Sequence, residues 1–440
     1  MDQIFTYTSR YILLFLMVLF TINGFSALKN NASKAYVKAL YIFQNIWLFL
    51  IVTISNLVLF INSQDQNYVF LLIYELILIA GIQVIYNLLF EKYNHALLNH
   101  QCMLLSLGLI VLSRLDSARA MKQLFIAIGA TVVTAFIPVF IKKFDFWIKL
   151  KILYAALGLM GLVLVFVAGK TEYGAKISLS LGPISIQPNE VVKLLFVLGL
   201  AAALSEAEEL FDYIRLSVVA LMHIGLLVLS RDLGGASILL VIYLLLFFLA
   251  TNNYFVLILG AGSMFGGLIF AAQHMAHVQK RIAAWKDPLS VIDGAGYQVS
   301  QSLFAISSGG WFGTGLNKGM PQKIPVVSKD FIFAAICEEY GVVFAICLIF
   351  SYISCFILIM NLALQKKDMF KCLIAAGFGL SFGFQIFLSI GGVIKFIPST
   401  GVTLPFVSAG GSSLMASFAS FAVIQGMSMK KRKANVNERV

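Results

Sequence analysis

Hydrophobic residues along the chain are gathered into runs of about 20 residues, and short polar segments separate one run from the next. A helix of about 20 residues is long enough to cross the hydrocarbon core of a bilayer, which is roughly 30 Å thick. The pattern therefore predicts an all-α integral membrane protein, a polytopic bundle of about thirteen spans. We place these spans near residues 11–28, 40–61, 68–90, 102–113, 123–141, 149–168, 188–205, 214–230, 233–250, 253–272, 331–361, 371–390 and 402–425.

Composition supports this interpretation and argues against a large soluble protein. Hydrophobic residues make up 60% of the 440 residues and charged residues only 12%, against about 25% charged in an ordinary soluble domain. The formal net charge is +12, but the basic residues lie in short segments between hydrophobic runs, where they favour retention of a loop in the cytoplasm. Nucleic acid is therefore not an expected partner. The five cysteines lie in or beside hydrophobic runs and form no CxxC pair, so we interpret them as packing residues rather than metal ligands.

Lysine-rich segments predict the side of the membrane on which each loop lies. If every span crosses once, then Lys29–Lys38, Lys142–Lys151, Lys366–Lys371 and the tail Lys430–Lys433 fall on one side, which should be cytoplasmic. The N-terminus is then outside and the C-terminus inside. The basic segment Arg114–Lys122 is an exception, because this scheme places it on the outer side.

Three regions follow from the pattern. We expect an N-terminal extension of about three spans over residues 1–100, a transmembrane core over 101–426, and a basic cytoplasmic tail over 427–440. The core contains a long extracytoplasmic loop, residues 273–330, that is rich in glycine and aromatic residues and sparsely charged. Loops of this length are usually functional or disordered, and this composition argues against disorder. We expect the loop to fold back over the membrane surface.

Polar side chains in or beside the spans are costly to bury and are therefore candidates for function. Glu190 and Lys193 lie one helical turn apart at the start of a span, either as a local pair that offsets the helix dipole or as functional groups. Asp232 is either a helix cap or a functional carboxylate. Lys395 either extends its charge to the membrane interface or binds a ligand.

The outer side also carries cations and carboxylates that could act together. Lysine and arginine match the charge and geometry of phosphate, so six outer-side cations could converge on a phosphate-bearing head group: Lys176, Arg231, Lys280, Arg281, Lys323 and Lys395. Three aspartates lie in the long loop or at its end, namely Asp287, Asp293 and Asp330. One of them could serve as a general base if it is desolvated, and a solvated loop acid or a cap is the alternative.

Five segments, in order along the chain, resemble the signature motifs of the SEDS proteins, the shape, elongation, division and sporulation family that includes FtsW, RodA and SpoVE. The resemblance covers about residues 102–425, which correspond to the ten-helix core of that family, and leaves the first three spans as an extension. The matching segments are residues 185–194 (QPSExxKL in the family), 232–234 (PDLG), 296–310 (GYQxxQSxxAIxxGG), 330–341 (DFIFAxxxEExG) and 398–413 (PxTGxxLPFxSYGGSS).

The resemblance implies a peptidoglycan glycosyltransferase that polymerises lipid II, an undecaprenyl-diphosphate-linked disaccharide peptide, at the outer face of the bacterial cytoplasmic membrane. It also implies a class B penicillin-binding protein transpeptidase as partner and a role in division, elongation or sporulation. A divalent cation at the diphosphate is a candidate cofactor. Carried over onto this sequence, the motifs supply further substrate-binding candidates: Gln187, Glu190, Lys193, Asp232, Gln298, Asp330, Glu338, Glu339, Thr400, Ser408 and Ser412.

The carboxylate of the long loop departs from the family pattern. The catalytic aspartate of the family normally lies in a DPxGxGYQ run, and here residues 291–298 read VIDGAGYQ. Ungapped alignment therefore sets Val291 at the aspartate and a carboxylate two residues later. Asp293 is the candidate base implied by the resemblance, with Asp287 behind it. A second departure is the NGARRWI-like run of the family, which reads YGAKISL over 173–179.

Two other functions stay open on the sequence alone. Ionisable residues along the spans are compatible with a transporter or flippase for a lipid-linked precursor. The departures from the motifs are compatible with a non-catalytic scaffold of a cell-wall synthesis complex.

Overall fold

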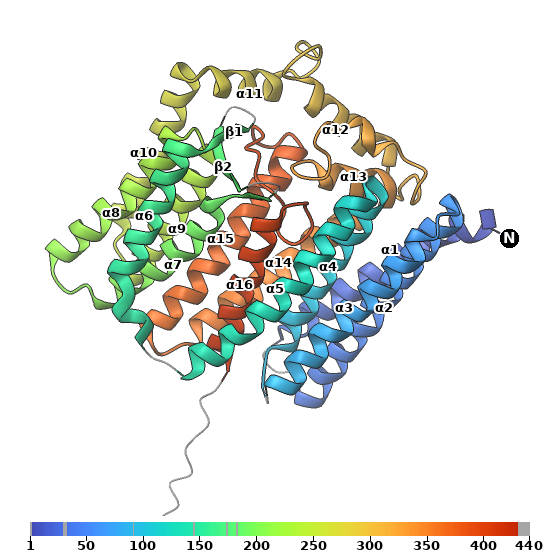
Figure 1. Ribbon diagram of the computed structural model, residues 1–440, viewed down its shortest axis with the longest axis horizontal. Coiled ribbons are helices and arrows are strands. Elements are labelled where there is room, and N and C mark those ends of the chain that lie inside the picture. The colour runs from blue at the N-terminus through green and yellow to red at the C-terminus, as the bar shows by residue number, and fades with distance from the viewer. Residues whose placement is uncertain are drawn as a thin grey trace, which may run out of the picture.

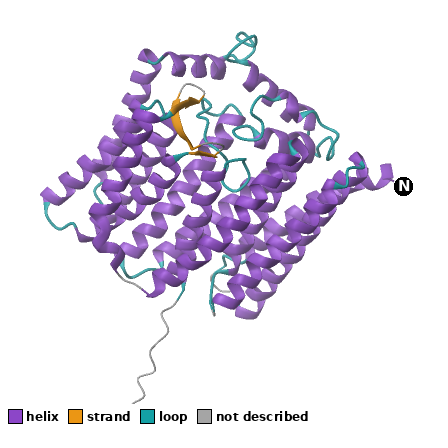
Figure 2. Ribbon diagram, viewed as in Figure 1, coloured by secondary structure: helices purple, strands orange, loops and turns teal. Residues whose placement is uncertain are grey.

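The predicted spans are present as helices in the computed structural model, which describes residues 2–29, 33–90, 92–143, 146–172, 175–181 and 184–429 (Figures 1 and 2). Within these residues, twelve helices are long and apolar enough to cross a membrane. The all-α polytopic fold is thereby confirmed. The twelve are α1 (Asp2–Ser26), α2 (Lys34–Ser63), α3 (Asn67–Leu89), α4 (His95–Leu115), α5 (Ser117–Lys143), α6 (Lys151–Ala168), α7 (Pro188–Glu206), α8 (Leu210–Leu229), α9 (Leu233–Thr251), α10 (Tyr254–His274), α14 (Val342–Leu364) and α15 (Met369–Val393).

The last predicted span, 402–425, is helical only from Gly411. It forms α16 (Gly411–Ser428), which packs against α5, α7 and α15. The residues before it make turns, and the Leu404 amide donates to Ser408 Oγ at 2.9 Å. The boundary predicted from hydrophobicity was wrong because an apolar run with internal hydrogen bonds of this kind can be buried without being helical. The predicted tail segment Lys430–Lys433 lies outside the described residues.

The predicted span 331–361 is in fact two helices, α13 (Ile332–Tyr340) and α14, which are broken at Gly341. Gly341 has φ +90°, in the region that favours glycine. A Cβ on this residue would lie 2.3 Å from the amide nitrogen of Gly313. The break therefore exists because two backbone segments cross here at a distance that only glycine allows.

Helix α4 is longer than the predicted run at 102–113. Its first turns carry Asn99, His100 and Gln101, whose polarity shortens the hydrophobic run. These side chains are buried inside the bundle rather than exposed to lipid. For example, Asn99 Nδ2 donates to the Tyr41 carbonyl of α2 at 3.1 Å. A span enclosed by other helices does not have to be apolar all round, because its polar groups find protein partners.

The extension, α1 to α3, lies along one edge of the bundle and is blue in Figure 1. Helix α1 packs against α2 and α14, and α2 and α3 pack against α4. Deep in the bundle, Thr21 Oγ1 of α1 lies 3.0 Å from Ser351 Oγ of α14. Interhelical hydrogen bonds of this kind add to close packing where the hydrophobic effect offers no preference for helix over lipid.

The long loop folds over one end of the bundle, as expected, and we call this end the loop side (Figure 1). It contains two helices, α11 (Ala276–Lys286) and α12 (Tyr297–Gly309), and a short 3₁₀ turn, η2 (Pro321–Lys323). A small antiparallel sheet lies on the same side, with strand order β1-β2-β3. Its strands are β1 (Lys170–Glu172), β2 (Ala175–Leu181) and β3 (Ile184–Ile186).

Candidate functional site

A cavity of about 730 Å³ opens on the loop side, between α5, the start of α7, the start of α16 and the segment that follows η2. A smaller cavity of about 80 Å³ lies beside it, toward α8 and α9. Gln187, Lys329 and Thr403 line both, so the two form one continuous site. The polar residues that line the pair are Asp116, Arg119, Lys122, Gln123, Ser185, Gln187, Asn189, Glu190, Lys193, Asp232, Gln322, Ser328, Lys329, Asp330, Thr403 and Ser412.

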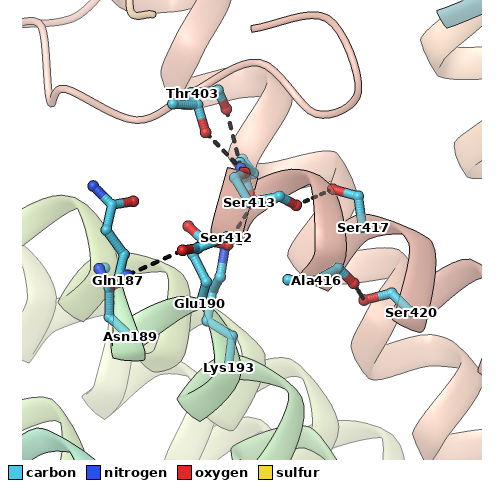
Figure 3. A network of polar contacts seen from close by, with 12 residues as sticks. Gln187, Asn189, Glu190, Lys193, Thr403, Ser412, Ser413, Ala416, Ser417 and Ser420 are labelled. Carbon is cyan, nitrogen blue, oxygen red and sulfur yellow. Dashed lines mark hydrogen bonds and ion pairs between the residues drawn. The ribbon is translucent and has the colours of Figure 1, made fainter. Parts of the chain in front are cut away.

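Helices α5, α7, α9 and α16 all begin at this site. Helix α7 has Pro188 in its first turn, and the Gln187 amide before it donates to Ser412 Oγ of α16 at 3.0 Å (Figure 3). Thr403 Oγ1 and Ser413 Oγ lie 3.0 Å apart in the same network. Helix N-termini present unpaired amides and partial positive charge, so this arrangement favours a negatively charged group in the cavity.

Glu190 and Lys193 form the predicted local ion pair, with Lys193 Nζ 2.8 Å from Glu190 Oε2. Lys193 Nζ also donates to Gln385 Oε1 of α15 at 2.9 Å, and Gln385 Nε2 donates to the Thr403 carbonyl at 3.0 Å. Both charged residues are buried. The chain of bonds joins α7 and α15 to the segment before α16. Glu190, Lys193 and Thr403 of this chain line the smaller cavity.

Asp232 caps α9, because its Oδ1 accepts from the Gly235 amide at 2.8 Å. Its Oδ2 accepts from Asn189 Nδ2 at 2.8 Å. The capping interpretation of this residue is confirmed, and the same carboxylate also lines the smaller cavity. The neighbouring Arg231 has φ +63° and an exposed side chain.

Asp330 is the carboxylate most influenced by burial at this site. A Cβ placed on Gly401 would lie 3.7 Å from both Asp330 Oδ2 and Arg281 Nη2, so the two charged groups approach the same glycine. Burial raises the pKa of Asp330, while Lys329 and Arg281 act in the opposite direction. Arg281 is held in place by its Nη1 bond to the Ser399 carbonyl at 3.1 Å. Burial lowers the pKa of Arg281, and the charges of Asp330 and Asp232 oppose that shift.

The larger cavity has a basic wall on α5 that our sequence analysis did not identify as part of a site. Arg119 and Lys122 line it together with Lys329. Arg119 pairs with Asp116 at 2.9 Å and donates to Ser328 Oγ at 2.7 Å. The signal for these residues was present in the sequence as the basic segment Arg114–Lys122, which violated the charge rule used for topology. In the folded protein Arg119 and Lys122 line a cavity.

Behind this wall lies a buried ion pair between Arg114 of α4 and Glu339 of α13, with Nε and Oε1 3.0 Å apart. Burial raises the pKa of Glu339 to about 7, and the Arg114 guanidinium is the main opposing influence. Arg114 Nη2 also donates to the Gly319 carbonyl at 3.2 Å. The neighbouring Glu338 accepts from the Met320 amide at 2.8 Å. These two predicted site residues therefore hold the loop to the core and do not line either cavity.

The structure does not bring the six predicted phosphate-binding cations together in the cavity. Among the described residues, the cations that line it are Arg119, Lys122, Lys193 and Lys329. None of the six predicted ones lines it, and Lys280 and Lys323 are exposed. A phosphate role for Lys176, Arg231, Lys280, Arg281, Lys323 and Lys395 stays a prediction.

The two predicted catalytic residues lie on an exposed turn between α11 and α12. Asp287 Oδ1 accepts from the Ser290 amide at 3.3 Å, as a cap of its own turn. Asp293 is exposed, and neither residue is part of the cavity lining. The catalytic role of either residue stays a prediction.

The remaining motif residues support the cavity wall. Gln298 Nε2 donates to the Pro325 carbonyl at 3.0 Å, and Ser408 Oγ donates to the Lys329 carbonyl at 2.5 Å. Thr400 precedes Gly401, which lines the smaller cavity. Part of the NGARRWI-like run, residues 173–174, lies outside the described residues.

Comparison with known proteins gives consistent matches. Residues 95–433 match the family described as cell cycle protein, FtsW/RodA/SpoVE. Peptidoglycan glycosyltransferase RodA of Mycobacterium tuberculosis is 33% identical over 298 residues, which are 63% of this chain and 64% of that protein. The chain thus spans just under two thirds of that relative. RodA of Mycobacterium leprae is 31% identical over 422 residues, 87% of this chain and 88% of that protein.

Among solved structures, a chain from the study "Structural coordination of polymerization and crosslinking by a peptidoglycan synthase complex" is similar with a TM-score of 0.65 and 25% identity. The match covers 77% of this chain and 98% of that one. The family match begins at residue 95, so α1 to α3 precede it.

Proposed function

This chain belongs to the FtsW/RodA/SpoVE family of cell cycle proteins, and we propose that it is a peptidoglycan glycosyltransferase that polymerises lipid II. The observation that carries the proposal is the pair of loop-side cavities, which basic side chains and the N-termini of α5, α7, α9 and α16 surround. A site of this kind suits a diphosphate, because it supplies both point charges and backbone amides. The names of the relatives from Mycobacterium support the same activity.

The substrate must present two parts to one site, a long isoprenoid tail and a diphosphate that links it to the sugar. The cavity meets this requirement, because it lies at the end of membrane-spanning helices whose outward faces are apolar. In our proposal the tail stays in lipid while Arg119, Lys122 and Lys329 neutralise the diphosphate. Arginine gives bidentate contacts to phosphate and lysine a point charge.

The reaction requires a base. The 4-hydroxyl of the GlcNAc of one lipid II attacks the anomeric carbon of the MurNAc that ends the growing strand. A C–O bond forms there, the bond from that carbon to the diphosphate oxygen breaks, and undecaprenyl diphosphate leaves with inversion. The hydroxyl proton passes to a carboxylate. Asp330 is our candidate from the structure, since it lines the cavity and its pKa is raised by burial.

We place the loop side at the outer face of the membrane. The lysine-rich segments that the charge rule assigns to the cytoplasm join the opposite ends of the spans. The C-terminus is then cytoplasmic. A transpeptidase of the class B penicillin-binding type is the proposed partner, in line with the peptidoglycan synthase complex that contains the similar chain.

The proposal is tested by incubating the purified protein with lipid II, alone and with its transpeptidase, and separating the glycan products by gel electrophoresis. We expect polymer from the natural protein and a loss of about 100-fold or more in Asp330→Asn, the usual size of a general-base effect. Asp65→Asn, an exposed carboxylate in the extension, is the matched control.

Asp293→Asn separates the two candidate bases. If it alone abolishes polymerisation while Asp330→Asn does not, the resemblance identified the base and the cavity geometry did not. Absence of polymer together with movement of labelled lipid II across liposomes would favour a flippase and overturn the proposal.

A further inference from the structure

Within the described residues, the loop-side ends of α1 and α2 contact the long loop of the core. We call residues 310–320 the junction loop. Asn62 Nδ2 donates to the Leu316 carbonyl at 2.8 Å, and Arg10 Nη1 donates to the Gly313 carbonyl at 3.3 Å. The Tyr11 ring lies 5.6 Å from that of Phe312. All of these contacts join the extension to a segment of the family core.

These side chains are oriented by partners within the extension. Thr6 Oγ1 donates to Asn62 Oδ1 at 3.0 Å, which directs the amide nitrogen toward the junction loop. Arg10 Nη2 donates to the Tyr11 hydroxyl at 2.8 Å, and its guanidinium lies 4.7 Å from the centre of that ring. The donors are therefore positioned before they reach the core.

The junction loop is in turn fixed to α13 and α14 through backbone bonds. The Thr314 amide donates to the Glu338 carbonyl at 2.9 Å, and the Gly315 amide donates to the Glu339 carbonyl at 3.0 Å. A Cβ on Gly313 would lie 2.3 Å from that same Glu339 carbonyl oxygen. Contact this close between backbones means that the loop cannot shift without moving the end of α13.

The chain that leaves the junction loop becomes the wall of the larger cavity. It passes through η2 and then forms residues 324–329, all of which line that cavity. At the other end, the extension is anchored inside the bundle by the bond between Thr21 and Ser351. A rigid connection therefore runs from the interior of the bundle, along α1 and α2, to the cavity wall.

We propose that the extension braces the junction loop and so positions the cavity wall for catalysis, with Asn62 and Arg10 as positioning residues. The effect on activity rests on the function proposed above, but the brace itself does not. It assigns a role to α1–α3, the helices that precede the family match.

Hydrogen–deuterium exchange of the protein in nanodiscs tests the brace without any activity. The variants are Asn62→Leu, which removes the donor to Leu316, and Arg10→Gln. The controls are Gln64→Ala, at the residue that caps the end of α2, and Thr8→Ala in α1, whose side chains donate to the nearby carbonyls of Ile61 and Ile4 rather than to the junction loop. We expect exchange of residues 312–329 to become about 2- to 10-fold faster in each variant, the effect of one lost hydrogen bond, and to stay unchanged in both controls.

The same proteins are then assayed for polymerisation of lipid II. We expect kcat to fall by about the same factor in Asn62→Leu and Arg10→Gln, with Arg10→Lys retaining most activity because it keeps a charged donor on a side chain longer than that of glutamine. Unchanged exchange in Asn62→Leu and Arg10→Gln would refute the brace. Faster exchange with unchanged polymerisation would refute its link to the cavity. If the natural protein makes no polymer, the proposed function fails, and the exchange result still decides the brace.

Discussion

Breaking the Arg114–Glu339 ion pair should have unequal effects depending on which partner is removed. The two side chains are 9% and 4% exposed, so neither charge is solvated when the other is lost. A carboxyl can exchange its charge for a proton, so a neutral residue at position 339 resembles a state that the folded protein already adopts, whereas a guanidinium keeps its charge in proteins. We therefore expect Arg114→Gln to destabilise the protein more than Glu339→Gln.

The pKa of Glu339 sets the size of the difference. Protonating a glutamate of ordinary pKa 4.5 at pH 7 costs about 3 kcal/mol. Because the pKa of Glu339 is already about 7 in the folded protein, nearly all of this cost already lowers the stability of the natural protein at pH 7. Arg114→Gln then adds little beyond its own lost hydrogen bonds, about 1–3 kcal/mol. At pH 7 the protonated and ionised forms of Glu339 are about equally populated beside Arg114, so Glu339→Gln, which mimics the protonated form, removes this protonation cost and should leave the protein at least as stable as the natural one.

The pH dependence of the two variants should differ as well. The folded protein holds a proton on Glu339 that the unfolded chain releases, so this group's stabilising contribution is lost as pH rises from about 4.5 to about 7. Removing Arg114 raises the pKa of Glu339 further, so in Arg114→Gln the loss continues above pH 7. In Glu339→Gln this dependence is absent.

Apparent melting temperatures in detergent, measured by intrinsic fluorescence between pH 6 and pH 9, test the order of the effects. The double variant should be more stable than Arg114→Gln alone at pH 7, because it removes the free-energy cost of protonating Glu339. The reasoning is refuted if Glu339→Gln at pH 7 melts as low as Arg114→Gln, or if the double variant melts below both.

Three further outcomes follow from the site. Arg281 opposes the rise that burial causes in the pKa of Asp330, so Arg281→Gln should raise that pKa further. If Asp330 is the base, the acidic limb of the pH–rate profile for polymerisation should therefore move to higher pH, and an unmoved limb would contradict the assignment. Gly341→Ala should destabilise by at least about 2 kcal/mol, since its Cβ would meet backbone atoms, while Gly294→Ala, with open space around it, should melt like the natural protein. We expect EDTA to slow polymerisation and added Mg²⁺ to restore it, because a diphosphate leaving group favours a bound cation; an unchanged rate in EDTA would contradict this.

Hydrophobic runs were sufficient to predict the membrane fold, because each span needs enough apolar residues to cross the hydrocarbon core and must pair its own backbone groups there. They failed where tertiary packing replaces lipid as the environment. Asn99 and His100 extend α4 beyond its apolar run because other helices surround them. Gly341 breaks a continuous apolar run because a second backbone segment crosses it, and no local pattern announces that contact.

The candidate site was predictable where its interactions are local. The Glu190–Lys193 pair and the Asp232 cap follow from spacing within one helix turn, and both are present. The basic wall was missed for a different reason. The charge rule considers only the side of the membrane, so it treats Arg119 and Lys122 as loop charges. The cavity that they line forms only when the segment after η2 packs opposite α5.

The choice of base depends on the same distinction. Motif alignment orders residues along the chain, and it therefore selects Asp293 beside GYQ. A general base must also be desolvated, which is a property of the packed site rather than of the sequence around it. Asp330 is desolvated because the chain turns from the cavity wall into α13 at this residue, close to Arg281 and Gly401. The exposed turn that carries Asp293 can supply a base only if it closes over the cavity. Protection of residues 287–296 from hydrogen–deuterium exchange when lipid II binds would therefore favour Asp293 as the base. Absence of this protection would favour Asp330.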